Sequence, residues 1–232
     1  MSRFPLFVDM KGRKCVVVGG GRIAARKIET LILFNAEIAV ISPEITDKLL
    51  ELKKTGSLTH LEKVYSEGDL EGAFLVIAAT TDREVNERIA EEAAVKNIFV
   101  NVADNPERCT FIFPSVVKKS ELVIGITTSG SYPAMSRSIR EKIERLLADL
   151  DEDVMKLLRE CRQRASAEIR NEDARTELLG RILEEAVFCD KELNRQQIVE
   201  RIFCEVLKDE KADQGWNEGK QACNSSEQLG CQ

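Results

Sequence analysis

The 232-residue chain has few of the side chains that build metal centres and disulfide frameworks. It contains one histidine, His60, and its seven cysteines include no C-x-x-C pair. An odd number of thiols without that spacing fits neither a disulfide framework nor a zinc cluster. We therefore predict reduced cysteines, with Cys15 as a small core residue, a structural role for His60, and no metal site.

Long apolar runs are missing as well. No stretch approaches about 18 uncharged apolar residues, the length of a membrane-spanning helix. The N-terminal residues MSRFPLFVDMKGRK lack the continuous apolar stretch of a signal peptide. The formal net charge of −6 argues against general affinity for nucleic acids. These absences predict a cytoplasmic protein that binds neither membranes nor nucleic acids.

A glycine-rich turn lies between an apolar run and a helix-forming segment at residues 14–24, KCVVVGGGRIA. Glycine at the first position of G-x-G-x-x-A allows a tight turn, glycine at the second lets backbone N–H groups approach a pyrophosphate, and alanine allows close helix packing. A second strand, 37–41, follows at the expected distance. The pattern predicts a dinucleotide-binding βαβ unit, although a glycine turn can also serve packing alone. The predicted cofactor contacts here are Gly19, Gly20, Gly21, Arg22, Ile23 and Ala24.

The acidic residue that usually ends the second strand and binds the ribose is absent, because Ser42, Pro43 and Glu44 occupy that bend. We predict these three residues as cofactor contacts. Two interpretations remain open. Glu44 reaches the ribose from two positions further on, or Pro43 ends the strand and Glu44 only favours the N-terminus of the next helix. No arginine follows the strand to bind a 2′-phosphate, which favours NAD over NADP. Arg22 and Lys27, near the turn, leave NADP open.

Strand-like and helix-like segments alternate up to about residue 102, which predicts a parallel sheet covered by helices. Residues 73–79 are apolar throughout, as a central parallel strand should be, and 58–64 and 98–102 are further strands. Ligands of open α/β sheets bind at the carboxyl ends of the strands. We therefore predict cofactor contacts at Thr80, Thr81, Asp82, Asn101 and Val102, and a further site residue at Asp104.

The pattern changes after Pro106. Residues 111–114 and 121–128, joined by 116–120, predict a β-pair, and a loop of small residues then leads into a helix over 134–147. Loop amides, hydroxyls and two arginines one turn apart predict a site for an anionic substrate. The alternative is an ordinary helix cap with solvated arginines. The predicted substrate contacts are Thr127, Thr128, Ser129, Gly130, Arg137 and Arg140.

Beyond residue 150 the chain is charged, poor in glycine and apolar at helical spacing, which predicts a small helical domain. The sequence thus predicts an α/β fold: a Rossmann-type parallel sheet, a small β-pair and helix, and a C-terminal helical domain. The predicted divisions are a nucleotide-binding domain at 1–110, a β-pair and helix region at 111–149, a helical domain at 150–209, and a disordered tail at 210–232.

Four segments, in order, resemble the dehydrogenase module of the siroheme synthases, the precorrin-2 dehydrogenase and sirohydrochlorin ferrochelatase family. They are VVVGGG-x-x-A-x-RK at 16–27, AATTD at 78–82, NVADNP…C…F…FPS at 101–115, and TSG-x-x-P followed by SIREKIE at 128–144. The resemblance covers about residues 1–205.

This resemblance implies an NAD-dependent oxidation of precorrin-2 to sirohydrochlorin. It also implies a homodimer in which the 111–149 region interlocks between subunits. It assigns the key carboxylate to Asp104, which would accept a proton or orient the nicotinamide. The alternative is that Asp104 only caps the turn before Pro106. A substrate with many carboxylates needs a local basic patch, for which the candidates are Arg108, Lys118, Lys119, Arg137 and Arg140.

Two other functions remain open. Some members of this family also insert iron, although the region expected around the tetrapyrrole has no histidine. A protein of another class, an NAD-sensing regulatory module whose helical part engages a partner, would bind NAD without turnover.

Overall fold

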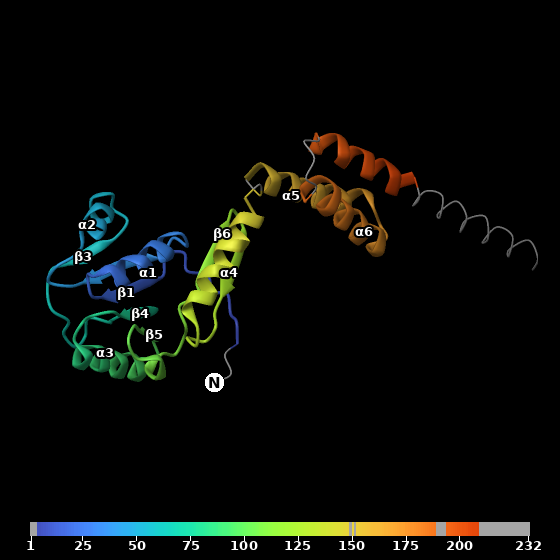
Figure 1. Cartoon of the computed structure of the whole chain (residues 1–232). Helices are drawn as coiled ribbons and strands as arrows, with labels where there is room; N and C mark the ends of the chain where they lie inside the picture. Colours follow the sequence, from blue (N-terminus) through green and yellow to red (C-terminus); the bar gives the residue numbers. More distant parts are fainter. Residues whose placement is uncertain (1–3, 149, 151, 189–193, 209–232) are drawn as a thin grey trace, which may run out of the picture. The chain divides into compact units, whose positions relative to one another are not determined.

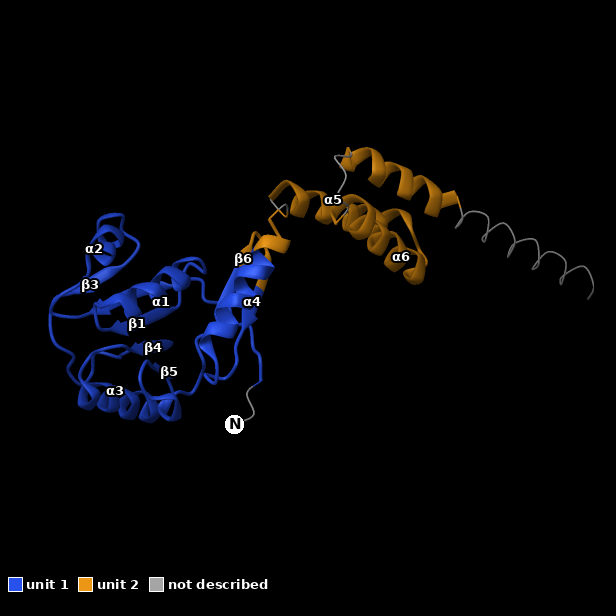
Figure 2. Ribbon diagram, in the orientation of Figure 1, with its two compact units in different colours: residues 1–117, 124–144 blue, residues 118–123, 145–232 orange. Residues whose placement is uncertain are grey.

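The computed structural model describes residues 4–148, 150, 152–188 and 194–208 (Figure 1). By its internal contacts the chain divides into two units (Figure 2). The first contains residues 1–117 and 124–144, and the second contains 118–123 and 145–232. The predicted tail at 210–232, with Trp216, Cys223 and Cys231, lies outside the described residues.

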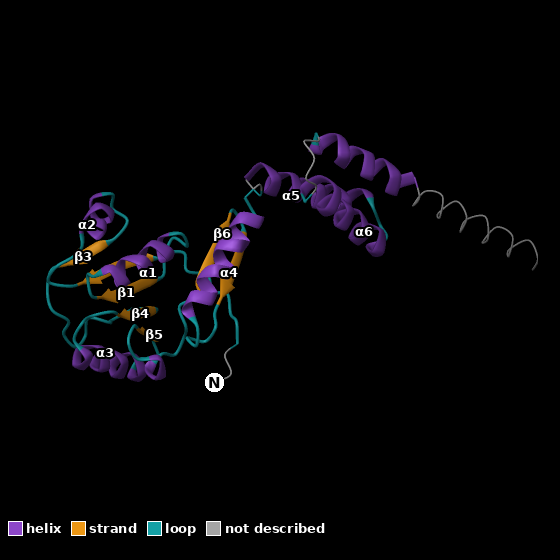
Figure 3. Cartoon of the chain, viewed as in Figure 1, coloured by secondary structure: helices purple, strands orange, loops and turns teal. Residues whose placement is uncertain are grey.

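The first unit contains a five-stranded parallel sheet with the order β3-β2-β1-β4-β5 (Figure 3). Strands β1 and β4 lie in the interior of this order and are apolar almost throughout, as strands covered on both faces must be. The predicted Rossmann-type parallel sheet is confirmed. The strands are β1 (Lys14–Val18), β2 (Glu37–Ile41), β3 (Thr59–Leu61), β4 (Leu75–Ala78) and β5 (Phe99–Val102).

The register brings the carboxyl ends of four strands level. Val18 of β1 lies opposite Ile41 of β2 and Ala78 of β4, and Ala78 lies opposite Val102 of β5. The chain therefore leaves all four strands at one edge of the sheet. The order reverses between β1 and β4, and such a switch point is where open α/β sheets bind their ligands.

Helices cover both faces of the sheet. Val17 and Ile77 point to the face covered by α1, whereas Val16 and Val76 point to the face covered by α3. Cys15 packs under α1 as predicted, and burial raises the pKa of its thiol to about 11, so the thiol stays protonated. The helices of this unit's sheet are α1 (Arg22–Ile32), α2 (Asp47–Lys54) and α3 (Arg83–Val95).

Two strands of this sheet are three or more residues shorter than predicted. The segment expected as a strand over 58–64 forms only β3, because the chain turns after Leu61. Asp69 holds that turn, accepting hydrogen bonds from Ser66 N at 2.8 Å and from Lys63 Nζ at 2.5 Å. The strand expected over 73–79 is limited to β4. The Nε2 atom of His60, in β3, lies 2.9 Å from the carbonyl oxygen of Ser42, a contact that fits the predicted structural role.

The predicted β-pair exists, but its first strand is displaced. Residues 116–120, expected as the connection, belong mostly to β6 (Ser115–Lys119), which pairs with β7 (Leu122–Ile126). Residues 111–114 form no strand, since the partly buried Phe111 and Phe113 pack against the core beneath α1 and Pro114 has no N–H to donate. Helix α4 (Pro133–Leu146) follows, with Pro133 at its first position.

The second unit is mainly helical and confirms the predicted C-terminal helical domain. It contains α5 (Glu152–Glu168), α6 (Glu172–Ile182), the short η2 (Leu183–Val187) and a last helix over 195–208. None of the helices in the described part of the chain has the length and apolar character needed to cross a bilayer. The core of this unit contains Cys161, Ala165, Leu178, Ile182, Ile202 and Phe203.

Candidate active site

The turn after β1 is too tightly packed for side chains at two of its three glycines. Gly19 has φ +117, and a Cβ atom there would lie 2.4 Å from the carbonyl oxygen of Ala79. A Cβ atom at Gly20 would lie 2.0 Å from the carbonyl oxygen of Glu44. At Gly21 the added Cβ meets no described atom within 4 Å. The first two positions of the turn therefore pack against other parts of the protein, whereas the third has open space beside it.

Gly21 is also the N-cap of α1, and no side chain in the described part of the chain caps this helix. Its first turn holds Arg22, Ile23 and Ala24 and has no acidic residue. Ala24 is buried against the sheet, whereas Arg22 and Ile23 are exposed. The uncapped amides and the helix dipole leave a positive end facing the open position, which fits a pyrophosphate.

The bend after β2 lies against this turn. Thr46 N donates to Gly20 O at 3.0 Å, and the buried Ser42 hydroxyl donates to Glu44 O at 2.7 Å. Pro43 and Glu44 are exposed. Helix α2 begins at Asp47, which is the acidic residue of its first turn, so Glu44 lies before the helix rather than in it. Its role as a ribose contact stays a prediction.

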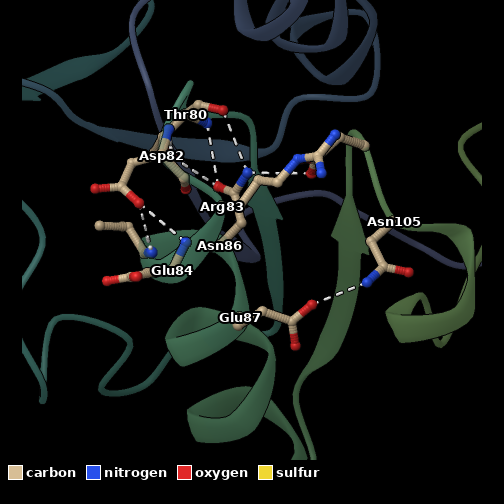
Figure 4. Close-up of polar contacts among 9 residues, drawn as sticks. Thr80, Asp82, Arg83, Glu84, Asn86, Glu87 and Asn105 are labelled. Atoms are coloured by element: carbon tan, nitrogen blue, oxygen red, sulfur yellow. Dashed lines mark hydrogen bonds and ion pairs between the residues drawn. The ribbon is translucent and has the colours of Figure 1, made fainter.

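The residues after β4 are engaged with the start of α3. Asp82 is the N-cap, and its Oδ1 accepts from Glu84 N at 2.9 Å and Val85 N at 3.3 Å. Thr80 donates from its hydroxyl to Asn86 Oδ1 at 2.8 Å (Figure 4). Thr81 is exposed. The structure thus gives Thr80 and Asp82 structural partners, and their contacts with the cofactor stay predictions.

Asp104 follows β5 at the same edge. Its side chain is 38% exposed, its Oδ1 accepts from Asn86 Nδ2 at 3.1 Å, and its Oδ2 lies 3.6 Å from Arg83 Nε. The turn before Pro106 is capped by the next residue, since Asn105 Oδ1 accepts from Glu107 N at 3.2 Å at the start of η1 (Pro106–Arg108). The capping role considered for Asp104 therefore belongs to Asn105.

Sequence reasoning missed one face of α3. Arg83, Asn86 and Glu87 have the spacing i, i+3, i+4, which places them on one side of a helix. They contact the loop after β5: the first two reach Asp104, and Glu87 Oε1 accepts from Asn105 Nδ2 at 2.8 Å (Figure 4). This spacing directly after the Asp82 cap is the signal that could have identified them.

Asn101, predicted as a cofactor contact, has protein partners for both of its polar atoms. It is 7% exposed, its Oδ1 accepts from Lys27 Nζ at 2.7 Å, and its Nδ2 donates to Phe111 O at 3.2 Å. Val102 is also buried, and its N–H points to Cys109 Sγ at 3.2 Å. Both residues hold the 109–113 segment against the sheet.

Lys27 also helps to hold the 109–113 segment, through its positively charged ammonium group. Its ammonium lies 4.5 Å from the centroid of the Phe113 ring, and burial lowers its pKa to about 8 from an ordinary value of 10.5. Between these pH values the unfolded chain binds this proton and the folded chain does not. The free energy of unfolding therefore gains a contribution that rises with pH across that window and is flat below it.

We predict that the Lys27→Met variant lacks this contribution. The difference in unfolding free energy, wild type minus variant, should be constant below about pH 8 and should increase from there to about pH 10. Urea unfolding of both proteins at neutral and alkaline pH measures it, and the titration of Cys15 is common to both. A difference that does not vary with pH would contradict the burial of a charged Lys27.

The predicted substrate loop forms turns that cap its own backbone. Thr127 Oγ1 accepts from Ser129 N at 3.0 Å, and Thr128 Oγ1 accepts from Tyr132 N at 3.1 Å. Ser129 and Gly130 have φ values of 55 and 86. The loop thus has the local geometry of a hydroxyl-rich turn before a helix, and its role in substrate binding stays a prediction.

The candidates for the basic patch differ in whether a neighbouring carboxylate neutralises their charge. Arg140 pairs with Glu144 at 2.5 Å, and Arg108 Nε pairs with Glu87 Oε2 at 2.7 Å. Arg137 is exposed, and no ion pair joins it to another described residue. Arg137 is therefore the cation of the α4 pair that is best placed to meet an anionic ligand. Lys118 and Lys119, the remaining candidates, lie in β6.

The fold and the open glycine turn define a dinucleotide-binding protein of the Rossmann type. Residues 6–115 match the model of the NAD_binding_7 family, described as "Putative NAD(P)-binding". The chain is 44% identical over 147 residues to a siroheme synthase of Methylobacillus flagellatus, covering 63% of this chain and 32% of that protein. It is 35% identical over 184 residues to the siroheme synthase of Thioalkalivibrio sulfidiphilus, covering 79% of this chain and 38% of that protein.

A solved structure extends the likeness over most of the chain. The protein "SirC, precorrin-2 dehydrogenase" superposes with a TM-score of 0.66 and 26% sequence identity, covering 86% of this chain and 98% of that chain. The chain is thus similar to the N-terminal module of the siroheme synthases and to a precorrin-2 dehydrogenase. It spans about a third of the length of the siroheme synthases it matches.

Proposed function

We propose that this protein oxidises precorrin-2 to sirohydrochlorin with NAD as the acceptor. The observation that carries the proposal is the meeting of the open glycine turn and the Asp104 carboxylate at one edge of the sheet. The turn follows β1 and Asp104 follows β5, with only β4 between them, so two strand spacings, about 10 Å, separate the two strands. An extended dinucleotide spans that separation. The likeness to a solved precorrin-2 dehydrogenase supports the choice of substrate.

The open position at Gly21 and the uncapped start of α1 would hold the pyrophosphate, and Glu44 would bind the ribose. Bound NAD supplies a hydride acceptor. Precorrin-2 loses two hydrogens, one as a hydride that becomes part of NADH and one as a proton. Asp104, a partly exposed carboxylate at the end of β5, would take that proton.

The substrate's carboxylates would meet the 127–130 loop and the exposed Arg137. Loop amides and hydroxyls are donors for such groups, and Arg137 adds a cation.

We also propose a cytoplasmic location. The free thiols in the described part of the chain support it: Cys15, Cys109, Cys161 and Cys204.

We also propose that the protein is a homodimer through the 111–149 region. Tyr132 and Met135, at the start of α4, are large apolar side chains left exposed on the single chain. Analytical ultracentrifugation should give twice the chain mass, and Tyr132→Glu with Met135→Glu should shift the protein to monomers. A monomeric wild type would reject the dimer.

The activity is tested with enzymatically generated precorrin-2, purified protein and NAD, following sirohydrochlorin absorbance under anaerobic conditions. The proposal predicts turnover with NAD and slower turnover with NADP. Addition of iron to the product mixture then tests metal insertion, which would proceed faster with protein than without if the protein is also a chelatase. Tight NAD binding without turnover would favour the regulatory module instead.

A further inference from the structure

We propose that Asn86 is a positioning residue that fixes the orientation of the Asp104 carboxylate for proton transfer. This inference rests on the proposed function, since Asp104 is the proton acceptor there. Asn86 lies in the second turn of α3, and only 2% of it is exposed.

Every polar atom of the Asn86 side chain has a partner. Its Oδ1 accepts from Thr80 N at 3.2 Å and Thr80 Oγ1 at 2.8 Å, and its Nδ2 donates to Thr80 O at 3.2 Å and to Asp104 Oδ1 at 3.1 Å. Three of these bonds anchor the amide to the end of β4, and Figure 4 shows the contacts with Thr80. The Nδ2 group therefore has a fixed position, from which it donates the fourth hydrogen bond to the Asp104 carboxylate.

The other charged groups near Asp104 hold it less firmly. Arg83 of α3 is 87% exposed in its side chain and lies 3.6 Å from Oδ2, so solvent screens that ion pair. Glu87 and Arg108 pair with each other and join α3 to η1, and Asp82 is committed to the cap of α3. A part-buried hydrogen bond from a buried, fully satisfied amide defines a direction better than an exposed ion pair does.

The two carboxylate oxygens of Asp104 therefore have different roles. Oδ1 accepts from the Asn86 amide, whereas the one contact of Oδ2 with a described residue is the ion pair with the exposed Arg83, so Oδ2 is left to accept a proton from the substrate. Proton transfer requires the acceptor oxygen within hydrogen-bond reach of the donor. A misplacement of about 1 Å costs roughly 100-fold in rate.

Asn86→Ala tests the positioning, because it removes the hydrogen-bond donor without changing the residue at position 104. We expect kcat for precorrin-2 oxidation to fall roughly 10- to 100-fold, with the affinity for NAD within about twofold of wild type. The KM for precorrin-2 should change less than kcat, since Asn86 touches neither ligand in this proposal.

Asn86→Asp separates positioning from packing. The new carboxylate keeps the shape and the acceptor for Thr80 N and Oγ1, although it loses the bond to Thr80 O. It faces Asp104 as a like charge, so the two groups share one proton over part of the pH range. While that proton is shared, the new carboxyl donates to Asp104 as the amide does. The ratio of variant kcat to wild-type kcat should therefore rise at least about fivefold from about pH 8 to about pH 6. Carboxyl ¹³C NMR should show the two groups titrating as a coupled pair.

The matched control is Glu92→Gln, at the far end of α3. Glu92 accepts from Tyr65 Oη and Gly68 N, and glutamine keeps the acceptor. This variant should show a kcat and a pH dependence like those of wild type. Unchanged kcat in both Asn86 variants, a kcat ratio that does not vary with pH, or loss of NAD binding together with activity would each overturn the positioning role. Absence of turnover in the wild type would instead overturn the proposed function, and this inference with it.

Discussion

Replacing Asp104 with asparagine should lower kcat for precorrin-2 oxidation by at least about 1000-fold, while the affinity for NAD stays within about twofold. The amide keeps the size of the carboxylate and can still accept the hydrogen bond from Asn86. It cannot take a proton from the substrate. Asp104→Ala should lose the same activity and the contact with Asn86 as well.

The control for this prediction is Glu107→Gln. It removes the same charge from an exposed side chain three residues further along the chain, in η1, and it should leave turnover within about twofold. NAD affinity is measured by fluorescence titration and turnover by sirohydrochlorin absorbance. If Asp104→Asn keeps a third or more of the wild-type rate, this carboxylate is not the proton acceptor.

Alanine at Gly20 and at Gly21 should separate folding from cofactor binding. At Gly20 the added methyl lies 2.0 Å from a backbone carbonyl oxygen, so the turn or the bend after β2 must move. We expect the free energy of unfolding to drop by about 2–3 kcal/mol, with loss of NAD binding. At Gly21 the methyl meets no described atom within 4 Å, and φ is −83. Stability should be unchanged, whereas NAD affinity should fall at least about tenfold because the methyl blocks the approach of the pyrophosphate.

Thermal unfolding and NAD titration of the two variants measure both effects. The paired design matters because loss of binding in Gly20→Ala alone could follow from unfolding. A Gly21→Ala variant that binds NAD as well as wild type would show that the pyrophosphate does not lie over this turn.

Local patterns in the sequence predict which strands form the parallel sheet and where the glycine turn lies. The glycine turn and the apolar runs of β1 and β4 depend on neighbouring residues, so their type and order could be inferred without a structure. Asn86 could not, because its burial arises only when α3 packs beside the loop after β5. Asn101 lies at a strand end, which predicts a cofactor contact, and that contact stays a prediction. Its hydrogen bond with Lys27 could not be predicted, because Lys27 lies 74 residues away in the sequence.

The β-pair shows how boundaries depend on tertiary packing. The run at 111–114 is apolar enough for a strand, yet Phe111 and Phe113 pack against the core under α1, and pairing begins only at Ser115. Likewise, Asp104 and Asn105 are both suited to capping the turn before Pro106. Only the folded backbone shows that Asn105 caps it and leaves the carboxylate of Asp104 partly exposed to ligands.

The stoichiometry of one anaerobic reaction tests whether this protein passes a hydride from precorrin-2 to NAD. Protein, NAD and precorrin-2 are incubated together, and NADH and sirohydrochlorin are quantified in the same sample. The account predicts one NADH for each sirohydrochlorin formed, with neither product when NAD or protein is omitted. Sirohydrochlorin formation without matching NADH, or bound NAD with no product, would contradict it.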